Sequence, residues 1–355
     1  MVFLQVKNRI VFYANNSHEV GAGHVMRLYA LAQAAQERFE ILFIYKECTS
    51  NLIKKLHSEG FATQKITTPL QHDELVSLHA SAVFIDDYYL TACEWKTIAN
   101  IAWFVVALDD EINTDVLLAD LVINPAPDTN LSEYKKRAPT AAFCFGPQFT
   151  YLRREFSSCS FIPLQSRDII LLTLGGTDSK SLALPLCKAL LALPNKFKIQ
   201  LLLGKVHQDQ EKLEQLQAQF PDFCIVCNPR SVAKHMMQAG LAISAAGGTL
   251  GELASLGVPT LALVTVDNQL PTLLSANAES WYRAIDFRHF EAADETSQHN
   301  IQLLKTMTEM VQDLWRDNCS RLYMSEHARQ LVDSRGCQRV IDKLSDCLDM
   351  SFKSK

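Results

Sequence analysis

The chain has 355 residues, of which 48% are hydrophobic and 21% are charged, so it is long enough for two domains that each bury a core. Its formal net charge is -5, and the charges of both signs are interspersed, so no basic block is present for nucleic acid or for an anionic membrane. No apolar run approaches the ~20 residues of a membrane span, and the N-terminus lacks the apolar core of a signal peptide. We therefore expect a cytoplasmic protein with a small-molecule substrate.

The first strand signal leads into a glycine turn that carries a histidine. Residues 10–13 are apolar, and the alanine-rich residues 28–38 are typical of a helix. The turn between them reads G-x-G-H-x-x-R and contains Gly21, Gly23, His24 and Arg27. At the carboxyl edge of a parallel sheet such a turn faces ligands, and an imidazole there can exchange a proton near neutral pH. Because the pattern is not G-x-G-x-x-G, it predicts a catalytic loop and not a nicotinamide site.

Further apolar runs alternate with helix signals through the first half of the chain. They span residues 40–45, 82–85, 103–108 and 121–124. Strands that alternate with helices predict an α/β domain with a parallel, doubly wound sheet.

Polar side chains follow two of these strands. Asp86 and Asp109 can act as acid and base, but an aspartate in this place can also cap the next helix or bond the loop. Tyr88 is a candidate for substrate contact, because a phenol offers a hydrogen bond and a flat face for a sugar ring. Packing between the domains is the alternative for this tyrosine.

The second half repeats the layout of the first. Residues 128–165 have the composition of an interdomain connection, and a buried strand follows at residues 168–174. Its exit carries Gly175, Gly176 and Thr177, which allow either phosphate binding at a helix start or a plain tight turn capped by Asp178.

A second strand-turn-helix unit carries the clearest nucleotide signal. Residues 241–245 form a strand, and Gly247, Gly248 and Thr249 form a turn whose N–H groups suit a diphosphate. Glu252 would then reach ribose hydroxyls, although a first-turn glutamate can also serve only the helix dipole. The strand at residues 260–264 ends near Asn268 and Gln269, whose amides can read a base or a sugar. The chain is helical from about residue 292.

The cysteines give no sign of a metal or of disulfides. The ten cysteines are irregularly spaced in a large chain, which is typical of reduced thiols. Cys224 and Cys227 have a spacing that zinc sites share, but no second ligand pair accompanies them, and they lie in a strand where residues three apart point to opposite faces.

The motifs taken together resemble the PseG family, the UDP-sugar hydrolases of pseudaminic acid biosynthesis. The resemblance covers nearly the whole chain, in the family's order. Besides the His24 turn, it rests on Ile85-Asp86-Asp87-Tyr88, Ala119-Asp120-Leu121-Val122-Ile123-Asn124, Tyr151-Leu152-Arg153-x-Glu155-Phe156, Gly175-Gly176-Thr177-Asp178, Gly247-Gly248-Thr249-x-x-Glu252, Asn268-Gln269 and Gly336-Cys337-Gln338-Arg339-Val340.

The resemblance implies a GT-B architecture similar to the MurG type, with two Rossmann-like domains facing a cleft. The domains would be residues 1–155, with the histidine loop, and residues 156–355, which bind UDP and include the C-terminal helices. It also implies that His24 is the general base and that water attacks C1 of UDP-2,4-diacetamido-2,4,6-trideoxy-β-L-altropyranose, with inversion at this carbon. Tyr88 is the second residue that we expect to be catalytic. No metal or cofactor is needed.

The chain departs from the family on the first strand and at its exit. The family usually has an arginine and an aspartate there, whereas the aligned residues are Tyr13 and Asn15. The lost charges leave the identity of the sugar open. Two other function classes also stay open: a GT-B glycosyltransferase that passes the sugar to an acceptor, and a nucleotide-sugar-binding protein that would have no use for His24.

Overall fold

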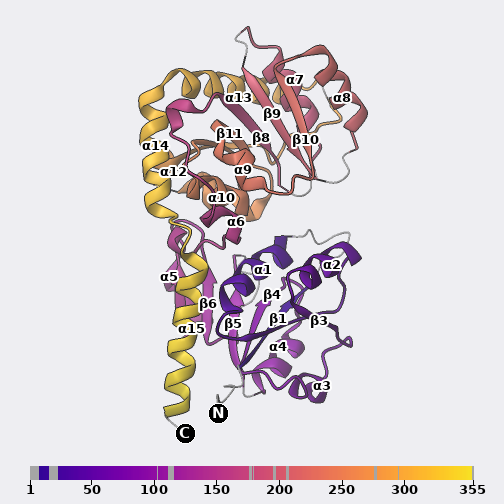
Figure 1. Cartoon of the computed structure of the whole chain (residues 1–355), viewed down its shortest axis with the longest axis vertical. Coiled ribbons are helices and arrows are strands. Elements are labelled where there is room, and N and C mark those ends of the chain that lie inside the picture. Colours follow the sequence, from indigo (N-terminus) through magenta and orange to yellow (C-terminus); the bar gives the residue numbers. More distant parts are fainter. Residues whose placement is uncertain are drawn as a thin grey trace. The chain divides into compact units, whose positions relative to one another are not determined.

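The computed structural model describes residues 8–15, 23–101, 103–110, 116–175, 178, 180–194, 197–204, 208–275, 278–294 and 296–353. The chain divides into two compact units (Figure 1). The first unit contains Met1–Arg154 and Ser334–Lys355, and the second contains Glu155–Asp333.

The first unit is built on a seven-stranded sheet in the order β3-β2-β1-β4-β5-β6-β7, with parallel pairing throughout. Its strands are β1 (Arg9–Ala14), β2 (Glu40–Tyr45), β3 (Ala62–Lys65), β4 (Ala82–Asp86), β5 (Phe104–Leu108), β6 (Leu121–Asn124) and β7 (Ala142–Phe145). Its helices are α1 (Gly23–Ala35), α2 (Ser50–Ser58), α3 (His72–Val76), α4 (Ala92–Ala99), α5 (Leu131–Arg137), the 3₁₀ turn η1 (Pro147–Phe149) and α15 (Gly336–Lys353).

The strands predicted in this half are confirmed as β1, β2, β4, β5 and β6. Two more strands, β3 and β7, are not evident from the sequence. β3 reads Ala-Thr-Gln-Lys and lies half-exposed at the sheet edge, so it lacks an apolar signal. α5 and β7 fall within residues 128–165, so the expectation that this whole stretch is an interdomain connection is wrong.

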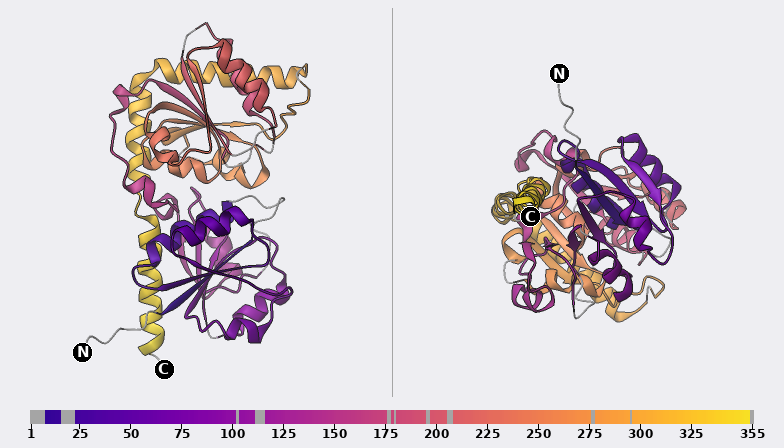
Figure 2. Two further views of the ribbon diagram at one scale, coloured as in Figure 1. Left: turned by 45° about the vertical axis from the view of Figure 1, so that its right-hand side comes forward. Right: turned by 90° about the horizontal axis from the view of Figure 1, so that it is seen from below.

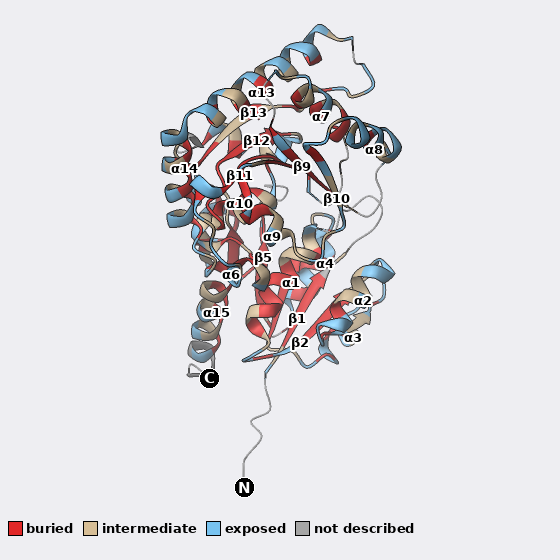
Figure 3. Ribbon diagram, turned by 45° about the horizontal axis from the view of Figure 1, so that its top comes forward, coloured by how far each residue is buried: buried red, intermediate tan, exposed pale blue. Residues whose placement is uncertain are grey.

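Both faces of the first sheet are buried. In β1, Ile10 and Phe12 belong to one core cluster, and Val11 and Tyr13 belong to another, because successive side chains of a strand point to opposite faces. Residues of α1 and α15 complete the first cluster, and residues of α3 and α4 complete the second. Figure 3 shows the resulting buried band along β1 and α1.

The last helix belongs to the first unit, which differs from the expected domain of residues 156–355. Val340, Ile341, Leu344 and Leu348 are buried in the cluster that includes α1. Their spacing places them on one face of a helix, and that face packs on the first sheet's helical layer. The chain divides between Arg154 and Glu155, and residues 334–355 belong to the first unit.

The second unit has a six-stranded sheet in the order β10-β9-β8-β11-β12-β13, again parallel (Figure 2). Its strands are β8 (Ile169–Thr173), β9 (Lys198–Leu203), β10 (Phe223–Cys227), β11 (Ala239–Ala245), β12 (Thr260–Val264) and β13 (Tyr282–Asp286). Its helices are α6 (Arg154–Ser157), which begins at the division, η2 (Leu164–Ser166), α7 (Ala183–Leu191), α8 (Gln210–Gln219), α9 (Val232–Met237), α10 (Gly248–Ser255), η3 (Asp267–Gln269), α11 (Leu270–Leu274), α12 (Ala278–Trp281), α13 (Gln298–Arg316) and α14 (Asn318–Leu331).

We searched the described residues for membrane-spanning helices and for metal-binding clusters. No helix among them has the length and apolar character needed to cross a bilayer. The same residues contain no group of three or more His, Cys, Asp or Glu side chains arranged to hold a metal ion. Cys224 and Cys227 are free and exposed on β10.

Candidate functional site

Two side chains near the start of α1 meet the end of a neighbouring strand in the first unit. His24 and Arg27 were expected in a glycine turn before the helix, but they lie in the first two turns of α1, three residues apart and therefore on one helix face. β4 pairs with β1, and its last residue, Asp86, is in register with Ala14 at the end of β1. The sheet thus carries Asp86 to the start of α1, although 62 residues separate it from His24 in the chain.

Asp86 is the centre of this cluster. Its Oδ1 lies 2.5 Å from His24 Nδ1, and Arg27 donates from Nε to Oδ2 at 2.9 Å and from Nη2 to Oδ1 at 2.7 Å. The Asp86 side chain is 0% exposed. Burial alone would raise the pKa of Asp86, but Arg27 and His24 outweigh it and hold that pKa below its usual value. Asp86 is therefore a buried carboxylate with two partners.

The ionised carboxylate decides which nitrogen of His24 carries the proton. A carboxylate accepts hydrogen bonds and cannot donate, so Nδ1 must donate to Asp86. Arg27 Nη2 lies 3.2 Å from the same Nδ1, which is then a contact between two N–H groups and not a hydrogen bond. Nε2 keeps its lone pair and can accept a proton.

Tyr88 and Asp110 complete the cluster. The Tyr88 hydroxyl donates to Asp110, and Arg27 Nη1 donates to the same carboxylate. The Tyr88 ring stands edge-on to the His24 ring, with centroids 4.5 Å apart. Burial raises the pKa of Tyr88 well above its usual value, Asp110 adds to the effect, and Arg27 opposes it. Tyr88 is therefore a neutral hydrogen-bond donor beside the imidazole.

Asp110 was not predicted, and its neighbour Asp109 is not part of the cluster. Asp109 forms an ion pair with Arg137 of α5 at 2.9 Å. Both aspartates follow β5, and successive residues of an extended chain point in opposite directions. A sequence signal existed, because two consecutive carboxylates at a strand end offer one to each side, but nothing in the sequence says which side faces His24.

The glycine turn after β8 is described in part. Gly175 has a φ of 81°, a value that favours glycine. Asp178 accepts from the backbone N–H groups of Leu182 and Ala183 at 2.9 and 2.7 Å, so it caps the start of α7. The predicted binding residues Gly176 and Thr177, like Gly21 in the first unit, lie outside the described residues.

The glycine turn after β11 lies beside the amide expected to act with it. Gly247 caps α10, and Gly247 and Gly248 are exposed. A Cβ added to Gly247 would lie 3.6 Å from Gln269 Nε2, and one added to Gly248 would meet nothing within 4 Å. Gln269 is itself held, because its Oε1 accepts from Thr265 N at 2.9 Å.

The other predicted residues of this turn lie nearby in the chain. Thr249 and Glu252 are half-buried on the first turns of α10, and Asn268 is exposed in η3. The structure thus places the turn, α10 and η3 at the carboxyl ends of the neighbouring strands β11 and β12.

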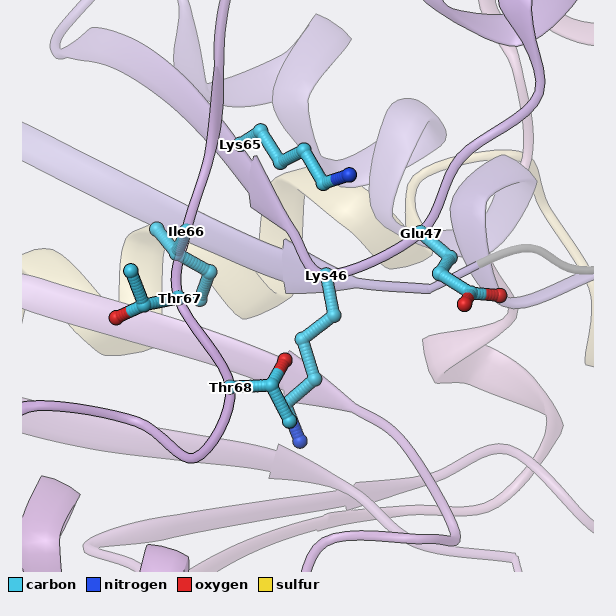
Figure 4. A pocket seen from close by; sticks show the side chains of 6 residues that line it. All are labelled: Lys46, Glu47, Lys65, Ile66, Thr67 and Thr68. Atoms are coloured by element: carbon cyan, nitrogen blue, oxygen red, sulfur yellow. The ribbon is translucent and has the colours of Figure 1, made fainter.

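The first unit also has a pocket of about 700 Å³ at the carboxyl ends of β2 and β3 (Figure 4). Its lining residues are Lys46, Glu47, Lys65, Ile66, Thr67 and Thr68. No sequence pattern indicates this pocket, because β3, which carries one wall, has no apolar pattern.

No family model matches the chain. SpsG of Bacillus subtilis, a spore coat polysaccharide biosynthesis protein, is 25% identical over 350 residues, which cover 96% of this chain and 98% of SpsG. An uncharacterised protein of Methanocaldococcus jannaschii is 26% identical over 270 residues, or 72% of this chain; the match spans about half (55%) of that protein's length.

Solved structures resemble the whole chain. MurG of Acinetobacter baumannii has a TM-score of 0.65 at 16% identity and covers 95% of this chain and 99% of its own. Anabaena HepE in complex with UDP and glucose has a TM-score of 0.60 at 12% identity, with 97% and 100% covered. The chain therefore has the GT-B type of architecture, with two Rossmann-like α/β units, as predicted.

Proposed function

We propose that the protein is an enzyme that acts on a UDP-sugar, and that it hydrolyses this substrate. The observation that carries the proposal is the pair of His24 and the buried Asp86, 2.5 Å apart at the carboxyl edge of the first sheet. This is the arrangement of a general base with a partner that orients it. Neighbours of the same fold include HepE, whose structure holds UDP and glucose.

The proposed reaction begins with proton transfer to His24. Nε2 takes a proton from water, whose oxygen bonds to C1 of the sugar as the bond from C1 to the UDP oxygen breaks. Attack opposite the leaving group inverts C1. Asp86 stabilises the imidazolium through Nδ1, and Tyr88 and Arg27 offer the sugar a ring face and N–H donors. The imidazolium then returns its proton to solvent.

The nucleotide is proposed to bind the second unit. N–H groups at Gly247, Gly248 and Thr249 would hold the diphosphate, because the start of α10 favours negative charge. Glu252 would accept from ribose hydroxyls. Two further sets are proposed to contact substrate: the amides of Asn268 and Gln269, and the turn of Gly175, Gly176 and Thr177.

The sugar we propose is 2,4-diacetamido-2,4,6-trideoxy-L-altrose, which is the substrate moiety of the PseG family. Support comes from the shared motifs, including the G-x-G-H-x-x-R turn and Ile85-Asp86-Asp87-Tyr88. The name of SpsG, a polysaccharide biosynthesis protein, agrees with a role in glycan biosynthesis. The second candidate is a GT-B glycosyltransferase, which the glycosyltransferases among the fold neighbours favour.

One experiment separates the two candidates. Purified protein is incubated in ¹⁸O-water with UDP-2,4-diacetamido-2,4,6-trideoxy-β-L-altropyranose and no acceptor. We expect many turnovers of UDP release, ¹⁸O in the sugar and not in the phosphate, and an inverted anomer in the first NMR spectra. UDP release that requires an added glycan or lipid acceptor would establish the transferase instead. Faster cleavage of another UDP-sugar would keep the hydrolase and change its substrate.

A further inference from the structure

A single amide side chain joins three strand ends next to the His24 cluster. Asn15 follows β1, and its Oδ1 accepts from the backbone N–H groups of Lys46 and Glu47, at 2.8 and 3.3 Å, after β2. Its Nδ2 donates to Asp87 Oδ2 at 2.6 Å, after β4, and to the Tyr13 hydroxyl at 3.1 Å. The two backbone donors require the amide oxygen on one side, and the carboxylate requires the NH₂ group on the other.

Asp87 is pinned from both sides by this arrangement. Its Oδ1 accepts from Tyr89 N at 2.8 Å, and its Oδ2 accepts from Asn15. Asp87 lies in the chain between Asp86 and Tyr88, which both contact His24. A shift of Asp87 would therefore move both contacts of the imidazole.

The far end of the same loop is held by a second bond from the end of β2. Lys46 Nζ donates to Glu94 Oε1 at 2.6 Å. Glu94 also accepts from the N–H and hydroxyl of Thr91 at the start of α4, at 3.1 and 3.0 Å. The loop from Asp87 to Thr91 is thus anchored at each end to residues that follow β1 and β2.

We propose that Asn15 is a positioning residue for the reaction at His24. It acts through Asp87, by holding the loop so that Asp86 faces Nδ1 and Tyr88 stands beside the ring. It also holds Lys46 and Glu47, which line the pocket of Figure 4, so one side chain sets both that wall and the loop. The inference rests on the proposed function for its catalytic meaning.

The first test is Asn15→Asp, which keeps the shape and the acceptor but removes the donor. The new carboxylate would face Asp87. Tyr13, Lys46 with its partner Glu94, and Glu47 lie around it. The aspartate that the PseG family usually has at this position is accompanied by an arginine on the first strand, whereas the corresponding residue here is the uncharged Tyr13, so no such cation offsets the second carboxylate. Two carboxylates at this distance share one proton, so the pKa of one of them is raised. The protonated carboxyl group can then donate a hydrogen bond, as the Asn15 amide does. The expected kcat relative to wild type is near one at pH 5 and falls by about a hundredfold at pH 8, with KM changed much less.

Two controls accompany this test, one for folding and one for the other side chain that Asn15 contacts. Thermal unfolding at each pH confirms that the rates refer to folded protein. Tyr13→Phe removes the hydroxyl that contacts both Asn15 and Asp87. It leaves the bonds from Asn15 and from the Tyr89 N–H to Asp87, and is expected to keep kcat within a few-fold of wild type. A kcat ratio for Asn15→Asp that stays constant across pH overturns the proposal.

The NMR signals of the His24 ring test the inference without any turnover. Asn15→Ala adds no charge, so a changed His24 signal in this variant reports a moved loop, and we expect one. An unchanged signal overturns the positioning role, even if the enzyme is a hydrolase. A wild type that cleaves no UDP-sugar, together with a changed signal, rejects the proposed function and keeps the inference.

Discussion

Arg27 contacts two carboxylates, Asp86 and Asp110, with one guanidinium. Two negative charges and one positive charge leave the cluster with one net negative charge while His24 is neutral. A proton that His24 takes up in the proposed reaction brings the net charge of the cluster to zero. The same charges explain why Asp86 remains ionised although its side chain is fully buried.

The first residue-level prediction concerns His24. His24→Ala should lower turnover by roughly 10²–10⁴-fold, the usual contribution of a general base, and should leave the affinity for UDP unchanged. UDP release and calorimetry measure the two quantities. His57→Ala is the matched control, since His57 is exposed and its Nε2 contacts Thr63 Oγ1 at 2.8 Å outside the cluster. Near-normal turnover in His24→Ala would assign the base to another residue.

The second prediction concerns the pH dependence of stability. The pKa of Asp86 is lowered in the folded protein, so its ionised form stabilises the fold above the unfolded pKa near 4, and this stability is lost as the pH falls further. Asp86→Asn should cost about 3 kcal/mol at pH 7, because it removes the fully buried carboxylate that pairs with the partly buried Arg27 guanidinium. Its cost should shrink below about pH 4. Urea unfolding of wild type and Asp86→Asn from pH 3 to 7 measures the loss of unfolding free energy and its change with pH. A loss that does not depend on pH would contradict the ion pair.

At the scale of elements, the start of α15 explains a glycine in the terminal motif. A Cβ at Gly336 would lie 2.3 Å from the Thr150 carbonyl oxygen and 2.7 Å from Phe149 C. Arg339 Nη1 donates to the Gln148 carbonyl at 2.8 Å. The helix therefore begins in direct backbone contact with η1, and only a residue without a side chain allows this approach.

Gly336→Ala should destabilise the protein by about 1–3 kcal/mol, because backbone atoms must move apart to admit the methyl group. This loss exceeds the few tenths of a kcal/mol by which alanine is otherwise more stable than glycine at a helix end. Asp346→Ala, on the exposed face of α15, should stay within about 0.5 kcal/mol of wild type. Chemical unfolding of the three proteins decides the matter, and an equally stable Gly336→Ala would show that α15 does not pack this closely.

At the scale of the whole molecule, the first unit is assembled from both ends of the chain and the second from one continuous segment, Glu155–Asp333. Among the described residues, those that form the core cluster of the second unit all come from this segment. A core formed within one segment supports independent folding.

We predict that residues 155–333 fold alone and bind UDP with an affinity within a few-fold of the full chain. Calorimetry measures this, and Glu252→Ala in the same fragment should weaken binding by more than ~1 kcal/mol through loss of a charged acceptor. A folded 155–333 fragment that does not bind UDP would place the nucleotide elsewhere.

Residues 1–333, which lack α15, should in contrast have a less stable first unit, since the core around α1 loses Val340, Ile341 and Leu344.

Local patterns in the sequence determined the elements that line the candidate sites. Strands such as residues 10–13 and 241–245 are mostly apolar runs that lead toward glycine turns. Strand burial and turn geometry of this kind depend on neighbouring residues in the chain. The α/β class and the Gly247-Gly248 turn were predictable for this reason, whereas His24 and Arg27, which were expected in a turn, lie in α1. Short or polar edge strands such as β3 carry no comparable signal.

Contacts between distant segments were decided by the tertiary structure. Asp110 and not Asp109 joins the His24 cluster, because the twist and register of β5 set which carboxylate points there. Asn15 meets Asp87 across 72 positions of sequence because β1 and β4 are adjacent in the sheet. α15 joins the first unit although it follows the second, since its apolar face is buried beside α1. Each outcome depends on which elements pack together, and residue patterns within one element do not encode that choice.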